Sequence, residues 1–308
     1  MEVLSEQEWH ARREHHQQRV RRWIDPRLAR RSKNEGHPIE DFLFEYYAYR
    51  PGKLLKWHPG IGVVLRGDTA GEYLYQKGYS EVADGITANA SRLPPRRVEA
   101  IPWLRDMLFR SRERPGLFGC WGLHEWAMVY RTESIRHGQW PLRVTSRQIS
   151  EIVESLGPRC THYDAFRFFS AVARPLNKFQ PTRLTAVALE QPGCLHANMD
   201  LYKWAFKLAP FTASELVADC FELATKIRAL DIRRALTISQ LLAICPSRSK
   251  RLKDAPNTNP SNGNSPFARR LSAIGWSPFA IRSSKKCRAA PLIARAAPQP
   301  SRRDDCLR

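Results

Sequence analysis

The sequence predicts a mainly α-helical protein, in which a single helical domain with minor β elements is followed by a disordered basic C-terminal tail. Three observations predict this class. Apolar residues recur at helical spacing over long stretches, strands and helices show no sustained alternation, and the composition changes abruptly after residue 233. With 308 residues, of which 43% are hydrophobic, the chain can bury a substantial core.

The composition change suggests a basic N-terminal helix at 1–36, a helical core domain at 37–233 and a tail at 234–308. Residues 1–233 contain 35 Lys and Arg against 27 Asp and Glu, whereas the tail contains 15 against 3. More than half of the net charge of +20 therefore lies in the tail, which is rich in Ser, Pro, Ala and Arg. Such a segment buries little apolar surface, so we expect it to be disordered.

The first third of the chain is predicted to contain two helices and a strand. Residues 5–33 favour a helix that Pro26 breaks, because proline lacks the amide proton that a helix interior uses. Pro38 begins a second helix and Pro51 ends it. Residues 61–84 contain a short strand.

The middle of the chain is predicted to add two helices and another strand. An amphipathic helix covers 95–112, and Pro94–Pro95 start it. The stretch 140–144 has the composition of a strand. A further helix follows, with Ser146 as its N-cap.

The segment from 185 to 233 is predicted to form two or three helices. Pro192–Gly193 and Pro210 separate them. Ser214 is expected to cap the last helix, which extends to the end of the core domain.

Several classes of protein are excluded by what the sequence lacks. The N-terminus lacks the apolar run of a signal peptide, and no stretch approaches eighteen uninterrupted apolar residues, so we expect a cytoplasmic protein with no membrane span. The seven cysteines form no CxxC pair and are expected to be reduced. Neither GxGxxG nor GxxxxGK[ST] occurs, so no nucleotide cofactor is predicted.

Three groups of histidines and carboxylates lie among apolar residues. They are His124 with Glu125, His162 with Asp164, and Glu190 with His196 and Asp200. Buried ionisable side chains must be paired or bound to something, which leaves three interpretations open. The groups satisfy one another structurally, they form a pocket in which a carboxylate activates water, or they hold one divalent metal through ligands such as His196, Asp200 and Glu190.

Four stretches together resemble the bacterial proteins named 3-methyladenine DNA glycosylase. They are HPIEDFLFEYYAYRPGKLLKWHPGIGVVL, FGCWGLHEWAMVYR, RCTHYDAFRFFSAVARPLN and QPGCLHANMDLYKWAFKLAPFTASELVADCFELATKIRALDIR, and they extend over about 37–233. The resemblance implies a DNA-repair enzyme that hydrolyses the N-glycosidic bond of alkylated purines, acts on double-stranded DNA and needs no cofactor.

The resemblance ends where the tail begins. Synonymous codons for 234–257 allow a shifted frame that reads SPYDLSAFGYLPIPIETAEGRAEY, which is similar to the continuation of those proteins. A frameshift that replaced the native C-terminus is therefore the leading interpretation of the tail. A natural basic arm that binds phosphates is the alternative.

Glycosylase chemistry requires a flipped base held between aromatic faces and a carboxylate that activates water. Asp164 or Glu125 is the expected carboxylate, with His124 and His162 beside them. The candidates for base stacking are Tyr46, Tyr47, Trp57 and Trp126. The N-terminal helix would contact phosphates. Two alternatives remain: a helical, metal-dependent hydrolase or oxidase of a small molecule, and a binding protein without catalysis.

Overall fold

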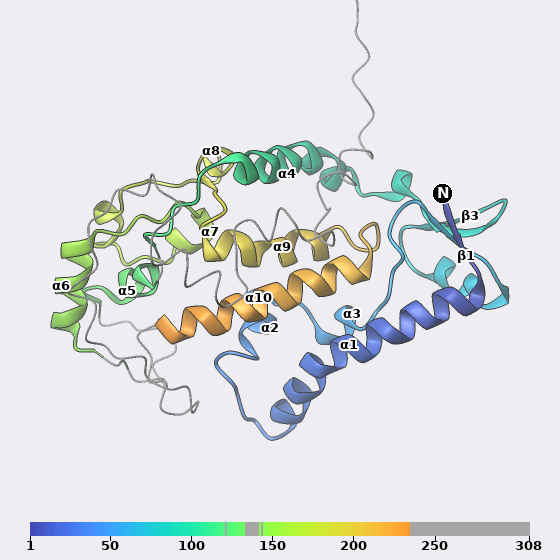
Figure 1. Ribbon diagram of the computed structural model, residues 1–308, viewed down its shortest axis with the longest axis horizontal. Helices are drawn as coiled ribbons and strands as arrows, with labels where there is room; N and C mark the ends of the chain where they lie inside the picture. The colour runs from blue at the N-terminus through green and yellow to red at the C-terminus, as the bar shows by residue number, and fades with distance from the viewer. Residues whose placement is uncertain (121, 133–141, 143, 235–308) are drawn as a thin grey trace, which may run out of the picture.

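The predicted mainly helical class is confirmed by the computed structural model, in which helices surround a central helix pair. The structure describes residues 1–120, 122–132, 142 and 144–234. Helices α9 (Leu195–Lys207) and α10 (Ser214–Arg234) lie side by side, between α1 (Glu6–Ser32) and α4 (Pro95–Glu113) (Figure 1). The tail at 234–308 lies outside the described residues except for Arg234, which ends α10.

Shorter helices and turns complete the helical part of the molecule. They are α2 (Phe42–Tyr46), α3 (Pro51–Leu54), α5 (Leu123–Val129), α6 (Ser146–Leu156), α7 (Tyr163–Phe166) and α8 (Ala186–Leu189), with 3₁₀ turns at Asp68–Tyr75, Ala90–Arg92 and Arg174–Leu176. Helices α5 to α8 gather at the end of the molecule opposite the N-terminus (Figure 1). No described helix is both long enough and apolar enough to cross a membrane.

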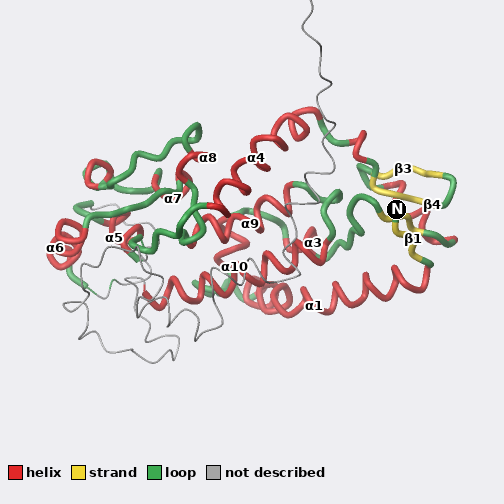
Figure 2. Tube along the Cα trace, turned by 45° about the horizontal axis from the view of Figure 1, so that its top comes forward, coloured by secondary structure: helices red, strands yellow, loops and turns green. Residues whose placement is uncertain are grey.

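A small sheet forms the end of the molecule that carries the N-terminus (Figure 2). Its strands are β1 (Glu2–Leu4), β2 (Val63–Leu65), β3 (Tyr79–Val82) and β4 (Gly85–Ala88), in the order β1-β2-β4-β3. β1 pairs parallel to β2, and the other two pairs are antiparallel. The strand predicted within 61–84 is present as β2, with β3 in the same stretch, whereas β1 and β4 were not predicted.

The main hydrophobic core joins α1, α2, α9 and α10 around Phe221, which is fully buried. Its ring centroid lies 4.9 Å from that of Tyr202, 5.0 Å from that of Trp23 and 5.2 Å from that of Phe44. A second cluster lies between the start of α1 and the sheet, and a third packs α5 against α6 and α7. The N-terminal helix is therefore built into the core through residues such as Trp9.

The predicted break at Pro26 is wrong, because α1 continues through it to Ser32. Pro26 is exposed, so the carbonyl that loses its helical donor can be solvated. Two residues earlier, Ile24 is fully buried against the core, which holds this part of the helix in place. Tertiary packing therefore outweighs the local cost of the proline.

The predicted helix caps also differ from the structure. Thr145, one residue before the expected Ser146, is the N-cap of α6 and forms a capping box with Gln148. Ser214 is the first residue of α10, and its hydroxyl accepts a hydrogen bond from the His58 amide at 2.8 Å. Ser214 therefore joins the helix to the α3–β2 connection.

Other boundaries agree with the prediction. The helix expected at 95–112 is α4, and Pro192 and Pro210 lie outside α9 and α10. The helix expected between Pro38 and Pro51 is an exception, because α2 covers only Phe42–Tyr46 and Pro51 begins α3 instead of ending a helix. Most of the strand predicted at 140–144 lies outside the described residues.

Asp41 joins the end of α1 to the segment that follows it. Its carboxylate is 1% exposed, contacts Arg30 at 2.5 Å and Arg27 at 2.8 Å, and accepts from the amide of His37 at 2.9 Å. Burial alone would raise the pKa of Asp41, but the hydrogen bonds from Arg30, His37 and Arg27 outweigh it and lower the pKa.

We expect Asp41→Asn to lower the free energy of unfolding at pH 7 by about 3 kcal/mol, as breaking a buried ion pair does. Because the folded pKa lies below the unfolded value of about 3.9, the wild-type advantage exists above that pH and is lost as the pH falls through the folded pKa. Urea unfolding at pH 7 and pH 3 tests this. Glu40→Gln, which removes an exposed partner of Arg30, should cost less than about 1 kcal/mol. If Asp41→Asn lowered the free energy of unfolding equally at pH 7 and pH 3, the stabilisation would not come from the ionised carboxylate.

Candidate functional site

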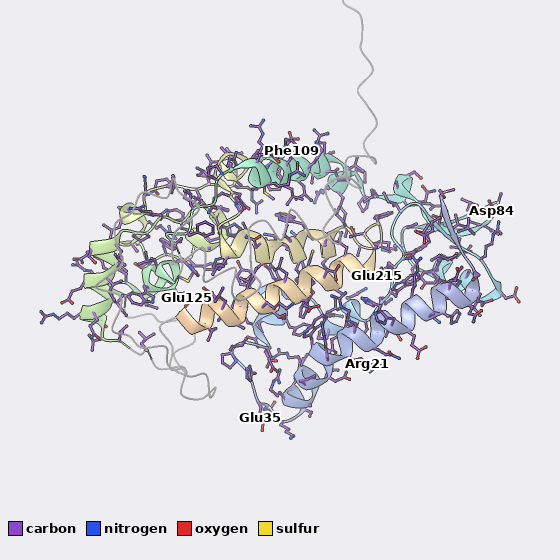
Figure 3. The ribbon with its side chains drawn as sticks, in the orientation of Figure 1. Arg21, Glu35, Asp84, Phe109, Glu125 and Glu215 are labelled. Carbon is purple, nitrogen blue, oxygen red and sulfur yellow. The ribbon has the colours of Figure 1, made fainter. Side chains whose placement is uncertain are left out.

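Ionisable side chains from five helical segments converge where α5, α7 and α8 meet α9 and α10. We call this cluster the polar centre. It consists of His124, Glu125, His162, Asp164, Glu190, His196, Asp200, Lys203, Arg228 and Asp231. In Figure 3, Glu125 lies beside the C-terminal end of α10. The three groups of histidines and carboxylates that the sequence singled out are thus brought together.

His196 on α9 links the other two histidines. Its ring centroid lies 4.5 Å from that of His124, edge to face, and 5.8 Å from that of His162, nearly parallel. Burial lowers the pKa of His196 well below its ordinary value, and the neighbouring His124 and His162 lower it further. The ring is therefore neutral at physiological pH.

One side of the polar centre is formed by His124, Glu125 and Asp231, and we call it the α5–α10 triad. Each of these residues offers a ligand atom, and the three atoms lie within 4.8 Å of one another. Consecutive positions on α5 supply His124 and Glu125, and the last turns of α10 supply Asp231. The arrangement gives one imidazole nitrogen and two carboxylates, a ligand set that suits Zn²⁺ or Mn²⁺.

Contacts with residues outside the triad fix the orientation of its side chains. The His124 Nδ1 lies 3.1 Å from the carbonyl oxygen of Cys120, and because a carbonyl only accepts, Nδ1 carries the proton. In the neutral ring, Nε2 then carries a lone pair that faces Asp231. Arg228 Nη1 lies 3.2 Å from Glu125 Oε1 and 3.2 Å from Asp231 Oδ2. The other Asp231 oxygen, Oδ1, is thereby left toward His124.

Two buried polar atoms face each other across this triad. His124 Nε2 and Asp231 Oδ1 are 3.8 Å apart, and neither has a hydrogen-bond partner within the described part of the chain. Both side chains are at least nine-tenths buried. An unpaired buried polar atom costs about 1–3 kcal/mol, so this geometry favours a cation between the two atoms.

The opposite side of the polar centre is formed by His162, Asp164 and Asp200, and we call it the α7–α9 triad. Its ligand atoms also lie within 4.8 Å of one another. His162 Nε2 lies 3.4 Å from Asp200 Oδ2, and Nδ1 lies 2.9 Å from Glu190 Oε1, although neither contact has hydrogen-bond geometry. Burial alone would lower the pKa of His162, but Glu190 and Asp200 outweigh it and raise the pKa to about 9.

The polar centre carries more negative than positive charge. Its carboxylates are Glu125, Asp164, Glu190, Asp200 and Asp231, and its permanent cations are Lys203 and Arg228. At pH 7 the raised pKa values leave Glu125 protonated and His162 charged, so four carboxylates face three cations and one negative charge is in excess. Burial, assisted by Asp231, raises the pKa of Glu125 to about 8 in spite of Arg228. The raised pKa of His162 therefore reflects its carboxylate neighbours, whereas that of Glu125 reflects burial first and Asp231 second.

The polar centre reaches the surface at the two expected catalytic carboxylates. The Asp164 side chain is 32% exposed and the Glu125 side chain is 20% exposed, whereas Asp231 is almost completely buried. These two carboxylates therefore contact solvent.

The predicted base-stacking residues do not form one site. Tyr46 is half-buried with its ring centroid 6.4 Å from that of His196, and the Tyr47 hydroxyl donates to Asp200 at 2.9 Å. Trp126 is buried in the third core cluster. Trp57 donates to Glu215 at 2.7 Å, near the opposite end of α10 from Glu125 (Figure 3). Trp57 is 2% exposed, so it is a core residue of the sheet end.

The basic face expected on the N-terminal helix is largely neutralised within the molecule. Seven arginines of α1 form ion pairs with carboxylates: Arg12, Arg13, Arg19, Arg21, Arg22, Arg27 and Arg30. Their partners compete with any phosphate for the same guanidinium groups. Contact of α1 with DNA stays a prediction.

Sequence reasoning missed Lys203, Arg228 and Asp231. A signal existed, because Lys203 follows Asp200 by three positions and Arg228 precedes Asp231 by three, so each pair lies on one helical face. These faces also carry buried apolar residues such as Met199 and Ile227. Charged pairs on a buried face indicate a polar site rather than a solvated surface.

No protein-family model, curated protein or solved structure matches the chain. The resemblance to 3-methyladenine DNA glycosylases therefore stays a prediction. The assignment of a function depends on the polar centre itself.

Proposed function

We propose that the chain is a metal-dependent hydrolase whose divalent cation is held by His124, Glu125 and Asp231. The observation that carries this proposal is the pair of buried polar atoms, His124 Nε2 and Asp231 Oδ1, that face each other at 3.8 Å and have no hydrogen-bond partner among the described residues. The excess negative charge of the polar centre supports it independently. Three protein ligands leave a coordination position open, as in catalytic rather than structural sites.

The chain's own groups would prepare this site in three ways. The Cys120 carbonyl holds His124 in the tautomer that binds through Nε2. Arg228 orients both carboxylates of the α5–α10 triad. His196 packs a neutral imidazole edge to face against His124 and so adds no positive charge beside the proposed cation. When bound, the cation would supply a water molecule of lowered pKa as nucleophile.

The first test is the metal content of the purified protein, together with the effect of chelation on hydrolysis of p-nitrophenyl phosphate and p-nitrophenyl acetate. We expect about one Zn²⁺ or Mn²⁺ per wild-type chain after dialysis, and less than a tenth of that in His124→Ala. Any hydrolysis should be lost with EDTA and restored by the cation. A wild-type chain that binds no divalent cation would contradict the proposal.

His16 offers a matched control for His124. It is 2% exposed, one ring nitrogen contacts the Leu54 carbonyl at 2.9 Å, and the other has no partner among the described residues. It belongs to neither triad. His16→Ala should therefore lose stability to a similar extent as His124→Ala while it retains the full metal content.

A second candidate is the glycosylase activity that the resemblance implies. It is favoured by Asp164, whose partly exposed carboxylate contacts Lys203 at 2.9 Å. Burial alone would raise the pKa of Asp164, but Lys203 outweighs it and lowers the pKa, which keeps the carboxylate ionised. This activity predicts release of 3-methyladenine from methylated DNA in the presence of EDTA, and loss of that release in Asp164→Asn. No release by the full-length chain would remove this candidate.

A further inference from the structure

The two triads of the polar centre differ in how far the protein itself satisfies them. In the α5–α10 triad, His124 Nε2 and Asp231 Oδ1 have no partner within the described residues. Each triad holds one cationic partner for both of its carboxylates, Arg228 in the α5–α10 triad and Lys203 in the α7–α9 triad. The difference lies in the aspartate oxygens, because Asp231 Oδ1 accepts no hydrogen bond from the described residues, whereas both oxygens of Asp200 accept one. The triads would otherwise look alike, since each contains one histidine and two carboxylates in ligand geometry.

Lys203 reaches into the α7–α9 triad from α9. Its ammonium group lies 2.9 Å from Asp164 Oδ2 and also donates to Asp200, one turn earlier on the same helix. Its position against the neighbouring Trp204 ring, 4.4 Å from the centroid, adds a cation–π contact. Lys203 is only 9% exposed, so its positive charge is committed to this cluster.

The remaining carboxylate oxygens of this triad also have partners, whereas neither nitrogen of His162 makes a hydrogen bond to a described residue. The second Asp200 oxygen accepts from the Tyr47 hydroxyl at 2.9 Å. The second Asp164 oxygen lies 3.6 Å from Arg167 Nε. His162 lies between Asp200 and Glu190, with a nitrogen toward each. A divalent cation would need the same carboxylate oxygens at about 2.0–2.2 Å, the place that the ammonium group takes.

We propose that the Lys203 ammonium is a built-in cation that replaces a second metal, so that the polar centre binds one divalent cation and not two. This inference rests on the proposed function, because it assumes that the α5–α10 triad binds the first cation. It extends that function, because the α7–α9 triad would then balance charge within the polar centre and position its side chains. A covalently attached cation cannot be removed by a chelator, so this half of the site keeps its charge when the metal is absent.

The test counts metal ions in full-length protein saturated with Zn²⁺ and then dialysed. Wild type should retain one ion per chain, Lys203→Met should retain two, and Lys203→Arg, which keeps a cation, should retain one. Two ions in wild type, or one in folded Lys203→Met, would overturn the inference while the proposed function stands. No ion in wild type would overturn both.

Asp164→Asn keeps the inference testable if Lys203→Met does not fold. In the wild-type background Asp164 is bonded to Lys203 and is not a metal ligand, so this variant should still bind one ion with an affinity within about threefold. Glu125→Gln, which alters the α5–α10 triad, is the matched variant and should lose the ion. Loss of the ion from Asp164→Asn would show that the metal uses the α7–α9 triad, contrary to the inference.

Discussion

Asp231→Asn is expected to weaken Zn²⁺ binding by more than about 100-fold, because even residues outside the ligand shell cost about 10–100-fold when they are replaced. The substitution keeps the size of the side chain but removes the charge and replaces one oxygen by an amide. Arg228 would retain Glu125 as its remaining carboxylate partner. Isothermal titration calorimetry of metal-free protein measures the change directly.

Asp219→Asn is the control for this substitution, because it changes the same residue type on the same helix. Asp219 pairs with Arg19 at 2.7 Å and is about one-fifth exposed, on the side of α10 that contacts α1. Its loss should cost some stability but leave the Zn²⁺ affinity unchanged. Equal weakening by both substitutions would mean that α10 is generally disturbed, which would contradict a ligand role for Asp231.

Phe221→Ala is expected to lower the free energy of unfolding by about 3–5 kcal/mol. Phe221 is fully buried between α1, α2 and α9, and the cavity left by its ring would lie against Trp23, Phe44 and Tyr202. Because Phe221 lies on α10 with Arg228 and Asp231, its packing also positions the α5–α10 triad. Urea unfolding of metal-free protein measures the loss without the contribution of bound cation.

Phe109 on α4 provides the exposed counterpart. It is 52% exposed and its side chain lies on the outer side of α4 (Figure 3). Phe109→Ala should change the free energy of unfolding by less than about 1 kcal/mol. A loss below about 1 kcal/mol for Phe221→Ala would show that α10 does not form the centre of the core.

The helical class could be predicted because helix boundaries depend on local chemistry. Pro95, Pro192 and Pro210 mark the limits of α4, α9 and α10 as expected. The errors arose where contacts between residues far apart in the sequence determine the local structure. Ile24 anchors α1 across Pro26, and β1 exists only because Val3 pairs with Val64, some sixty residues away in the chain.

The candidate site could be predicted only in part, for a similar reason. Residue type alone singled out His124, His162 and His196 and their nearby carboxylates, and the structure brings them together. The partners Arg228 and Asp231 lie about a hundred residues from α5 along the chain, and only the packing of α5 against α10 reveals them. The stacking candidates show the opposite case, because Trp57 is an aromatic residue that serves the core.

Anomalous diffraction at the zinc edge from crystals of the Zn²⁺-loaded protein tests the proposed metal site most directly. The α5–α10 triad predicts one peak within about 2.0–2.2 Å of His124 Nε2, Asp231 Oδ1 and a Glu125 oxygen. The Lys203 ammonium should lie between Asp164 and Asp200 with no peak there. No peak at the polar centre, or a peak only at the α7–α9 triad, would contradict the assignment of the α5–α10 triad as the metal site.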